Sequence, residues 1–188
     1  MAGAGTLLLV RHSEPAVDPT APASAWPLSP VGRARCARLA EALARHAPGH
    51  IAASPEPKAL ETAELVAAAL GVSASLAAGL EEHHRETVPF LSDFRTRVAE
   101  LFARPDERVL GEESAAEALT RFARALEGVV AAWPAPGPPC IVAHGTVLSL
   151  YLAGRCHLDP MSLWDQLRCP SLVVVTGDTF HLETDFDP

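Results

Sequence analysis

Short, continuous apolar runs separated by helix-forming segments are the feature that most constrains the fold of this chain. Three such runs occupy residues 7–10 (LLLV), 50–54 (HIAAS) and 140–144 (CIVAH). Runs of this kind are typical of strands that are buried on both faces of a parallel sheet. Residues 171–183 (SLVVVTGDTFHLE) instead indicate a hairpin with a two-residue Gly-Asp turn. We therefore expect an α/β three-layer sandwich, with a mostly parallel central sheet, helices on both faces and an antiparallel edge hairpin.

Capping patterns mark the helices between these runs. The Ser-Pro pair at 29–30 predicts the N-cap and first position of a helix that ends near residue 45. A second helix is predicted over 58–70, with Gly71 directly after it. Further helices are predicted after residue 92, over 114–132 from a Ser-x-x-Glu capping box, and over 146–152. The 188 residues contain no internal repeat and no long linker, so we expect a single domain over residues 1–188.

Composition excludes several functional classes. Lys and Arg number 15 against 23 Asp and Glu, and the net charge of -8 argues against a broad nucleic-acid surface. No stretch of about 18 apolar residues occurs, so we expect no membrane partner. The N-terminus lacks the basic segment and the long apolar run of a signal peptide, which favours a cytoplasmic protein. The four cysteines form no Cys-x-x-Cys pair, which argues against a zinc knuckle or redox motif. The sequence does not determine the oligomeric state.

Polar side chains follow the predicted strands at the points where these strands end. Arg11 and His12 follow the first strand, His144 and Gly145 lie at the end of the strand predicted over 140–144, and Lys58 begins the helix after the strand at 50–54. Ligands of open α/β sheets bind outside the carboxyl ends of the strands, so we expect these groups to lie close together. A guanidinium, an ammonium group, imidazoles and the N–H groups of a helix N-terminus suit a phosphate group. We expect no competing carboxylate among them.

An imidazole in a phosphate pocket suggests nucleophilic catalysis. Neutral His12 can attack phosphorus to form a phosphohistidine, which water then hydrolyses. The leaving oxygen needs a proton donor, and the polar loop at 79–86 offers Glu81 and Glu82 after a predicted strand near Leu76. The like charge of a bound phosphate dianion raises the pKa of a nearby carboxylate, which suits it for general acid catalysis.

Five short motifs in order resemble the signature of the histidine phosphatase superfamily, also called the phosphoglycerate-mutase-like family. They are RHSE at 11–14 in the place of Arg-His-Gly, LSPVG at 28–32, SPEPKALETA at 54–63, LEE at 80–82 and HG at 144–145. Each motif alone is weak, but the ordered set is specific. The resemblance extends from residue 7 to about residue 150 and implies the fold predicted above.

The resemblance also implies roles for the reacting groups. His12 takes the place of the phosphorylated nucleophile, and Arg11 and His144 hold the phosphate beside it. Glu82, the third residue of the Leu-x-Glu motif, takes the place of the proton donor, and Glu81 is the alternative register. The implied enzyme is a histidine acid-base phosphatase, a phosphoric monoester hydrolase.

Further phosphate contacts follow from the same resemblance. Lys58 stands where the family has a second phosphate-binding arginine, and the backbone at Gly145 and Thr146 completes the anion site. The family uses no metal and no cofactor, so we expect neither. An alternative metal site formed by Glu82 with His83 and His84 is weaker, because adjacent side chains on an extended loop point apart.

The chain departs from the family pattern at several positions. Ser13 replaces a glycine, and Lys58 cannot form the two-pronged contact of an arginine. The asparagine that usually follows the Arg-His motif is absent from residues 13–20, and the aromatic element typical of mutases is absent from residues 82–90. We therefore expect a metal-independent phosphatase. The alternatives are a phosphomutase and a catalytically weak module that binds phosphate or phosphoproteins.

Substrate identity is not determined by these motifs. We expect a small phosphorylated substrate, such as a sugar phosphate or another metabolite, with a protein phosphohistidine as the alternative. The loops at 13–27 and 83–112 are predicted to set specificity. Within them, we expect Trp26 to serve in packing. Arg85 is expected to be solvated, and the alternative is that it lines the mouth of the pocket.

Overall fold

The central element is one six-stranded sheet with the strand order β3-β2-β4-β1-β5-β6, seen in a computed structural model that describes residues 5–187. The strands are β1 (Thr6–Arg11), β2 (His50–Ala53), β3 (Ser73–Leu76), β4 (Cys140–Ala143), β5 (Ser171–Thr176) and β6 (Thr179–Glu183). The pairs β1–β4, β2–β4 and β2–β3 are parallel, whereas β1–β5 and β5–β6 are antiparallel. The predicted mostly parallel sheet with an antiparallel edge hairpin is confirmed.

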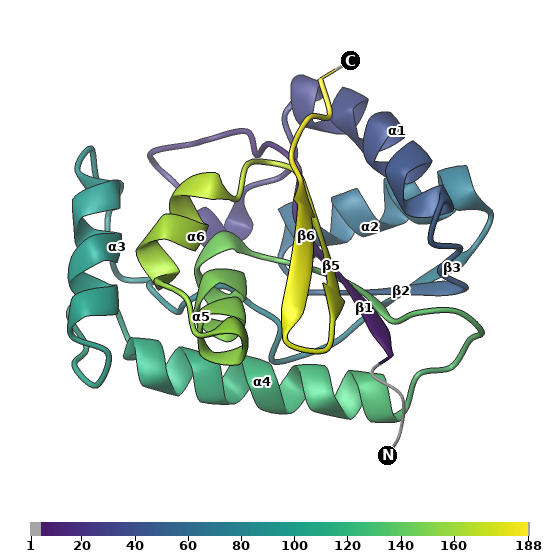
Figure 1. Cartoon of the computed structure of the whole chain (residues 1–188). Coiled ribbons are helices and arrows are strands. Elements are labelled where there is room, and N and C mark those ends of the chain that lie inside the picture. Colours follow the sequence, from purple (N-terminus) through teal and green to yellow (C-terminus); the bar gives the residue numbers. More distant parts are fainter. Residues whose placement is uncertain (1–4, 188) are drawn as a thin grey trace.

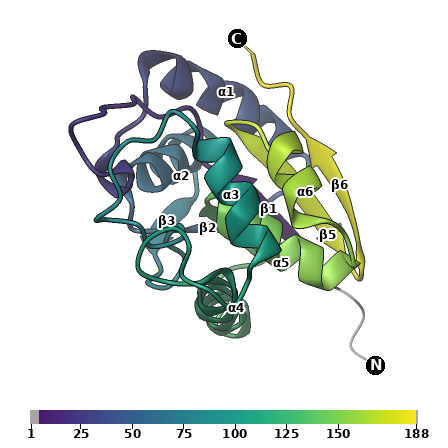
Figure 2. The ribbon, with the colours of Figure 1, turned by 90° about the vertical axis from the view of Figure 1, so that its left-hand side faces the viewer.

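Helices cover both faces of this sheet (Figure 1). They are α1 (Pro30–Ala44), α2 (Pro57–Leu70), α3 (Phe94–Ala103), α4 (Ala115–Ala131), α5 (Gly145–Cys156) and α6 (Pro160–Gln166), with a short 3₁₀ turn, η1, at Ala23–Ala25. Helices α1 and α2 pack together on one face, and α4, α5 and α6 lie on the other (Figure 2). Helix α3 packs against α6. This arrangement is the three-layer sandwich that the sequence predicts.

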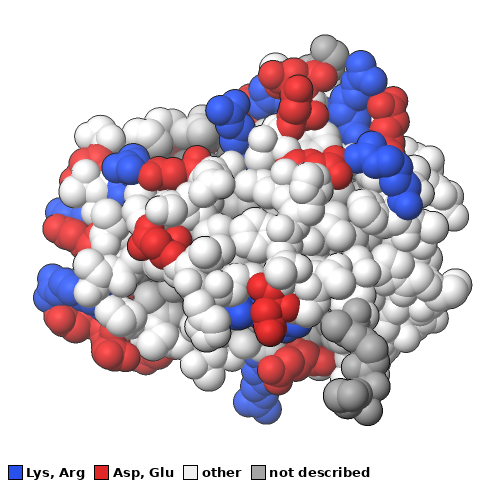
Figure 3. Space-filling model, in the orientation of Figure 1, with Lys and Arg blue, Asp and Glu red and all other residues white. Residues whose placement is uncertain are grey.

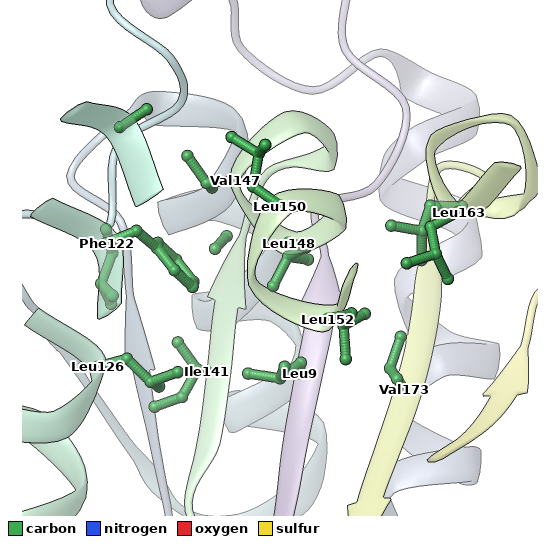
Figure 4. Packing of buried hydrophobic residues seen from close by; sticks show 14 of the residues in the cluster. Leu9, Phe122, Leu126, Ile141, Val147, Leu148, Leu150, Leu152, Leu163 and Val173 are labelled. Atoms are coloured by element: carbon green, nitrogen blue, oxygen red, sulfur yellow. The ribbon is translucent and has the colours of Figure 1, made fainter. Parts of the chain in front are cut away.

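Successive side chains along each strand point to opposite faces of the sheet, and this divides the core into two parts. On β1, Leu8 belongs to the cluster on the α1–α2 side, and Leu9 belongs to the cluster on the α4–α5 side. Both side chains are fully buried. Figure 4 shows the second cluster, in which Leu9 and Ile141 of neighbouring strands face Phe122 of α4 and Leu148 of α5. Strand β1 is apolar on both faces and therefore packs against both helical layers. This packing fixes the position of the carboxyl end of β1, where His12 follows.

Two boundaries and one helix differ from the sequence-based expectation. Strand β1 includes Arg11, which we had placed just after the strand. Helix α5 extends beyond the predicted 146–152 segment in both directions. Helix α6 was not predicted, although Asp159 accepts a hydrogen bond from the Ser162 N–H at 2.7 Å and Pro160 occupies the first turn. With seven residues, α6 is too short to carry a clear hydrophobic period.

The start of α1 is packed directly against the segment that follows His12. The Ser29 N–H donates to the Glu14 carbonyl at 2.9 Å, and Ser13 Oγ donates to the Gly32 carbonyl at 2.7 Å. A Cβ atom on Gly32 would lie 2.1 Å from the Glu14 carbonyl oxygen. The glycine of the LSPVG motif is therefore required by close backbone packing, which positions the chain next to His12.

We expect the substitution Gly32→Ala to lower the free energy of unfolding by about 1–3 kcal/mol, because the added methyl group forces two backbone segments apart. Urea titration of the purified chain measures this change. Gly128→Ala is the matched control, since a Cβ atom at this exposed position of α4 meets nothing within 4 Å. The control should raise stability by about 0.5–1 kcal/mol through helix propensity. Equal effects of the two substitutions would contradict this account.

The surface carries charges of both signs. On the face shown in Figure 3, acidic and basic side chains are interspersed around a broad area that has neither. Within residues 5–187, no helix has the length and apolar character needed to span a membrane. The expectation that no signal peptide is present rests partly on residues 1–4, which lie outside the described part of the chain.

Candidate active site

The predicted site residues meet at the carboxyl edge of the sheet. Strands β1 and β4 are parallel neighbours, and the His12 N–H continues their ladder by donating to the Ala143 carbonyl at 2.9 Å. His12 and His144 therefore follow adjacent strands at the same edge. Their ring centroids lie 5.2 Å apart with an angle of 61° between the planes. Strand pairing alone brings together two imidazoles that are separated by more than a hundred residues in the sequence.

His12 is held as a neutral imidazole with a defined tautomer. Its side chain is buried, and its Nδ1 atom lies 2.6 Å from the Ser13 carbonyl oxygen. A carbonyl oxygen can only accept, so Nδ1 carries the proton and Nε2 keeps its lone pair. Burial, followed by the positive charges of Lys58 and Arg11, lowers the pKa of His12 to about 3. At neutral pH the ring therefore has an unprotonated Nε2 atom.

His144 is fully buried and also neutral. Its Nε2 atom lies 2.8 Å from Ser54 Oγ and 3.6 Å from a carboxylate oxygen of Glu56. Burial and the nearby charge of Lys58 hold the pKa of His144 well below its ordinary value. Its Nδ1 atom is buried and has no hydrogen-bond partner among residues 5–187. A buried ring nitrogen without a protein partner is uncommon, and a water molecule or a ligand can supply the missing hydrogen bond.

Arg11 lies against the start of α5. A Cβ atom on Gly145 would be 2.9 Å from the central guanidinium carbon of Arg11, so a larger residue there would displace the guanidinium from its present position. The Nη1 atom donates to the Leu167 carbonyl, while the buried Nε atom has no partner within the described residues. Arg11 and His144 thus each contribute a buried nitrogen with unused hydrogen-bonding capacity to the same edge of the sheet.

Glu82 caps helix α5 from a different loop. Its carboxylate oxygens accept hydrogen bonds from the Thr146 N–H at 3.0 Å and from the Val147 N–H at 3.2 Å. Burial opposes ionisation of Glu82, but the charge of Arg85 and the N–H donors outweigh it and lower the pKa of the carboxyl group. The N–H of Thr146, which the family resemblance assigns to a phosphate site, therefore donates to the Glu82 carboxylate.

Glu81 occupies a different environment. One of its carboxylate oxygens lies 3.7 Å from Nη1 of Arg121. Arg121 also donates to the backbone carbonyls of Gly79, Glu81 and Glu82 at 2.9–3.0 Å and pairs with the Glu113 carboxylate. This arginine fixes the loop so that Glu82, rather than Glu81, reaches the helix N-terminus.

Glu56 corrects the expectation that no carboxylate competes in the pocket. Its buried side chain pairs with the Lys58 ammonium group and accepts the Glu82 N–H at 2.7 Å. Burial raises the pKa of Glu56 despite the nearby Lys58 charge. Lys58 also donates to the Ala23 carbonyl at 2.7 Å, so its ammonium group is engaged on two sides. The lysine contributes less net positive charge to the site than an unpaired cation would.

Arg85 is another correction, because it is not simply solvated. Its guanidinium carbon lies 4.8 Å from the centroid of the Phe94 ring, and Nη1 donates to the His83 carbonyl at 3.2 Å. Arg85 lines a small polar gap together with Glu56 and Glu82. The positive charge of Arg85 therefore stabilises the ionised form of Glu82 and contributes to the lowered pKa of the Glu82 carboxyl group.

Sequence reasoning missed Glu56 and Arg121. Glu56 stands at the N-cap of α2 but makes no side-chain capping bond. A carboxylate held between two prolines, two residues before Lys58, was a usable signal for a local ion pair. Arg121 gave no such signal, because the backbone carbonyls that it binds lie about 40 residues away in sequence.

The proposed cluster of Glu82, His83 and His84 does not converge. His83 is buried with Nε2 directed to the Glu113 carbonyl at 2.7 Å, while Nδ1 of His84 lies 3.8 Å from the Glu113 carboxylate. Within residues 5–187, no group of three or more His, Cys, Asp or Glu side chains has an arrangement that holds a metal ion.

Comparison with solved structures identifies relatives of this fold. Mycobacterial glucosyl-3-phosphoglycerate phosphatase aligns with a TM-score of 0.75 and 18% identity, over 98% of this chain and 99% of that one. YhfR of Bacillus stearothermophilus aligns with a TM-score of 0.71 and 24% identity over 98% of each chain. Phosphoserine phosphatase of Entamoeba histolytica, in complex with 3-phosphoglyceric acid, gives 0.70 and 16%, over 97% of this chain and 98% of that one.

Sequence comparison gives the family. No curated protein sequence matches the chain. The profile described as "Histidine phosphatase superfamily (branch 1)", however, matches residues 7–184, nearly the whole chain. This match includes the strand ends that carry His12 and His144 as well as the loop that carries Glu82. The chain therefore belongs to the histidine phosphatase superfamily.

Proposed function

We propose that this chain is a phosphatase that hydrolyses small phosphomonoesters through a phosphohistidine on His12, without a metal or a cofactor. The observation that carries the proposal is the state of His12, whose Nε2 atom is unprotonated while its Nδ1 proton is held by the Ser13 carbonyl. The buried, unpartnered nitrogens of Arg11 and His144 support it, since phosphoryl oxygens are suitable partners for both. A mycobacterial relative at 22% identity has been solved with inorganic phosphate.

In the first step, Nε2 of His12 attacks phosphorus and forms a P–N bond while the ester P–O bond breaks. Glu82, protonated beside the bound dianion, transfers its proton to the leaving oxygen, so the alcohol departs neutral. The Nδ1–H of His12 remains bonded to the Ser13 carbonyl and stabilises the positive charge that the ring acquires. Arg11, His144 and Lys58 hold the phosphoryl oxygens as charge shifts onto them.

In the second step, water attacks phosphorus and the P–N bond breaks. The Glu82 carboxylate takes a proton from the water, so phosphate is released while His12 and Glu82 return to their starting states. The same carboxyl group thus acts as an acid and then as a base. Its position at the N-terminus of α5 stabilises the ionised form that exists between the two steps.

The proposal is tested with p-nitrophenyl phosphate in excess chelator. Release of p-nitrophenol together with an equal amount of inorganic phosphate is the expected result. Loss of activity on chelation, restored by adding a metal, would overturn the metal-independent route. Conversion of a diol monophosphate to its isomer without phosphate release would indicate a mutase. Thermal stabilisation by phosphate without any turnover would indicate a binding module.

Removal of the Glu56 charge is predicted to improve phosphate binding rather than to weaken it. We expect Glu56→Gln to strengthen binding of inorganic phosphate on the order of tenfold, because it removes a buried negative charge and releases Lys58 for a charge-assisted hydrogen bond. Isothermal titration of the purified variant with phosphate measures the change in Kd.

The matched control is Glu64→Gln, an exposed position on the same helix. This control changes the net charge equally, and we expect no more than about a twofold effect on Kd because long-range surface charges are screened. Weaker binding of phosphate to Glu56→Gln than to the parent chain would show that Glu56 supports the site rather than competing in it.

A further inference from the structure

An apolar cavity lies next to the proton donor and is not used by the reaction described above. The cavity has a volume of about 250 Å³ and is lined mainly by apolar side chains, including Val17, Trp26, Val88, Phe90, Leu91 and Phe94. These residues come from the two loops that flank the site, at 15–27 and 85–94. Ala23 and Arg85 line both this cavity and the small polar gap that contains Glu82. The cavity is thereby adjacent to the position where the leaving group of a substrate receives its proton.

Trp26 and Arg85 carry the polar side-chain atoms among the residues that line this cavity. The Trp26 Nε1–H is directed at the carbonyls of Asp18 and Ala21, at 2.9 and 3.2 Å, which leaves the ring to form an apolar wall. The guanidinium of Arg85 lies over the Phe94 ring and donates to the His83 carbonyl through Nη1. A leaving group with several hydroxyl groups would lose water against the apolar walls and find few hydrogen-bond partners there, which disfavours its binding.

The size of the cavity indicates how much it can hold. A cavity of about 150 Å³ is enough to bind benzene, so 250 Å³ accommodates one aromatic ring with a short linker. The volume is too small for a helix or a strand of a partner protein. Trp26 and Phe90 have ring centroids 6.5 Å apart, and Phe90 remains half exposed at the rim. Aromatic walls of this kind favour a flat apolar group.

We infer that this cavity binds the apolar part of the leaving group, so that the preferred substrates are phosphomonoesters with an aromatic ring close to the ester oxygen. The inference rests on the proposed phosphatase function and adds the chemical class of the substrate. With the phosphate at His12 and the ester oxygen at Glu82, the group carried by that oxygen lies next to Arg85 and the apolar cavity. Sugar phosphates are then disfavoured.

The test compares 2-phenylethyl phosphate with ethyl phosphate, whose alcohols have nearly the same acidity, so that the chemical step is matched. We expect kcat/KM to favour the phenylethyl ester on the order of 10- to 100-fold, as burial of an apolar group in a fitted pocket allows. Phe90→Ala should lower this ratio severalfold. The control Leu158→Ala removes an equally exposed apolar side chain that follows the far end of α5, and the ratio should not change.

Binding of the non-hydrolysable 2-phenylethylphosphonate and ethylphosphonate separates this inference from the proposed function. If both esters are hydrolysed with nearly the same kcat/KM, and the two phosphonates bind with equal Kd values, the apolar subsite is overturned while the phosphatase function stands. No hydrolysis, with preferential binding of the phenylethylphosphonate, would overturn the proposed hydrolysis and support the subsite. No hydrolysis and no binding of either phosphonate would overturn both.

Discussion

Replacing His12 with asparagine is expected to reduce phosphate release by at least about 10⁴-fold, since it removes the only group that forms the covalent bond to phosphorus. Asparagine retains a side-chain N–H near the Ser13 carbonyl, so the local backbone should be kept. The measurement is kcat for p-nitrophenyl phosphate in excess chelator, together with the thermal midpoint as a check on folding. The midpoint should change by only a few degrees, while turnover is lost.

A second measurement tests the intermediate itself. Mixing the parent chain with substrate and quenching in alkali, where phosphohistidine survives, should reveal a protein mass increased by one phosphoryl group, located in the peptide that contains His12. His181→Asn is the control, because its ring is exposed on β6 at a distance from the site, and activity should be unchanged. Full activity of His12→Asn, or phosphate found on another residue, would remove the basis for the phosphohistidine route.

The fold follows from the sequence wherever local pattern and tertiary environment agree. The runs at β1, β2 and β4 are apolar on both faces because helices cover both faces, and this property is visible in the sequence. Ser29 and Ser114 cap α1 and α4 as predicted, since capping depends on neighbours within three residues. Helix α6 was missed because seven residues give little periodicity, although its cap was readable.

The part of the site that could be predicted consists of the residues that directly follow the strands. Parallel pairing of β1 with β4 places His12 beside His144, and this follows from the order of strands and motifs. The electrostatic balance could not be predicted in this way. Whether Lys58 is available to an anion depends on the side-chain direction of Glu56, which is set by the Glu82 N–H from a loop 26 residues away. Long-range contacts of this kind leave no periodic signal.

The protonation of Glu82 is the other property that the sequence did not reveal. A carboxyl group near a bound phosphate dianion has a raised pKa, but in the ligand-free structure the Arg85 charge and the α5 N–H groups lower the pKa of Glu82. The proton-donating form is therefore scarce in the free enzyme at neutral pH and increases as the pH falls. We expect kcat/KM for an alkyl phosphate to rise as the pH falls from 8 to 5, while His12, with a pKa of about 3, stays unprotonated across this range.

The substitution Glu82→Gln should remove the contribution of Glu82 to this pH dependence and reduce kcat for ethyl phosphate by about 10²- to 10⁴-fold, the usual contribution of a general acid. The substrate's own second ionisation, with a pKa of about 6, affects both profiles equally, so the difference between the profiles is the informative quantity. For p-nitrophenyl phosphate the loss should be much smaller, because p-nitrophenolate departs without needing a proton.

Glu81→Gln is the matched control for this prediction, since it removes a neighbouring carboxylate that faces Arg121 at 3.7 Å rather than the start of α5. A partly exposed ion pair contributes little, so activity with both esters should stay within about threefold of the parent chain. If Glu81→Gln instead caused the large, ester-dependent loss and Glu82→Gln did not, the proton donor would be Glu81, and the carboxylate at the helix N-terminus would serve only to cap α5. An equal loss for both esters in Glu82→Gln would mean that the carboxyl group positions the phosphate without donating a proton.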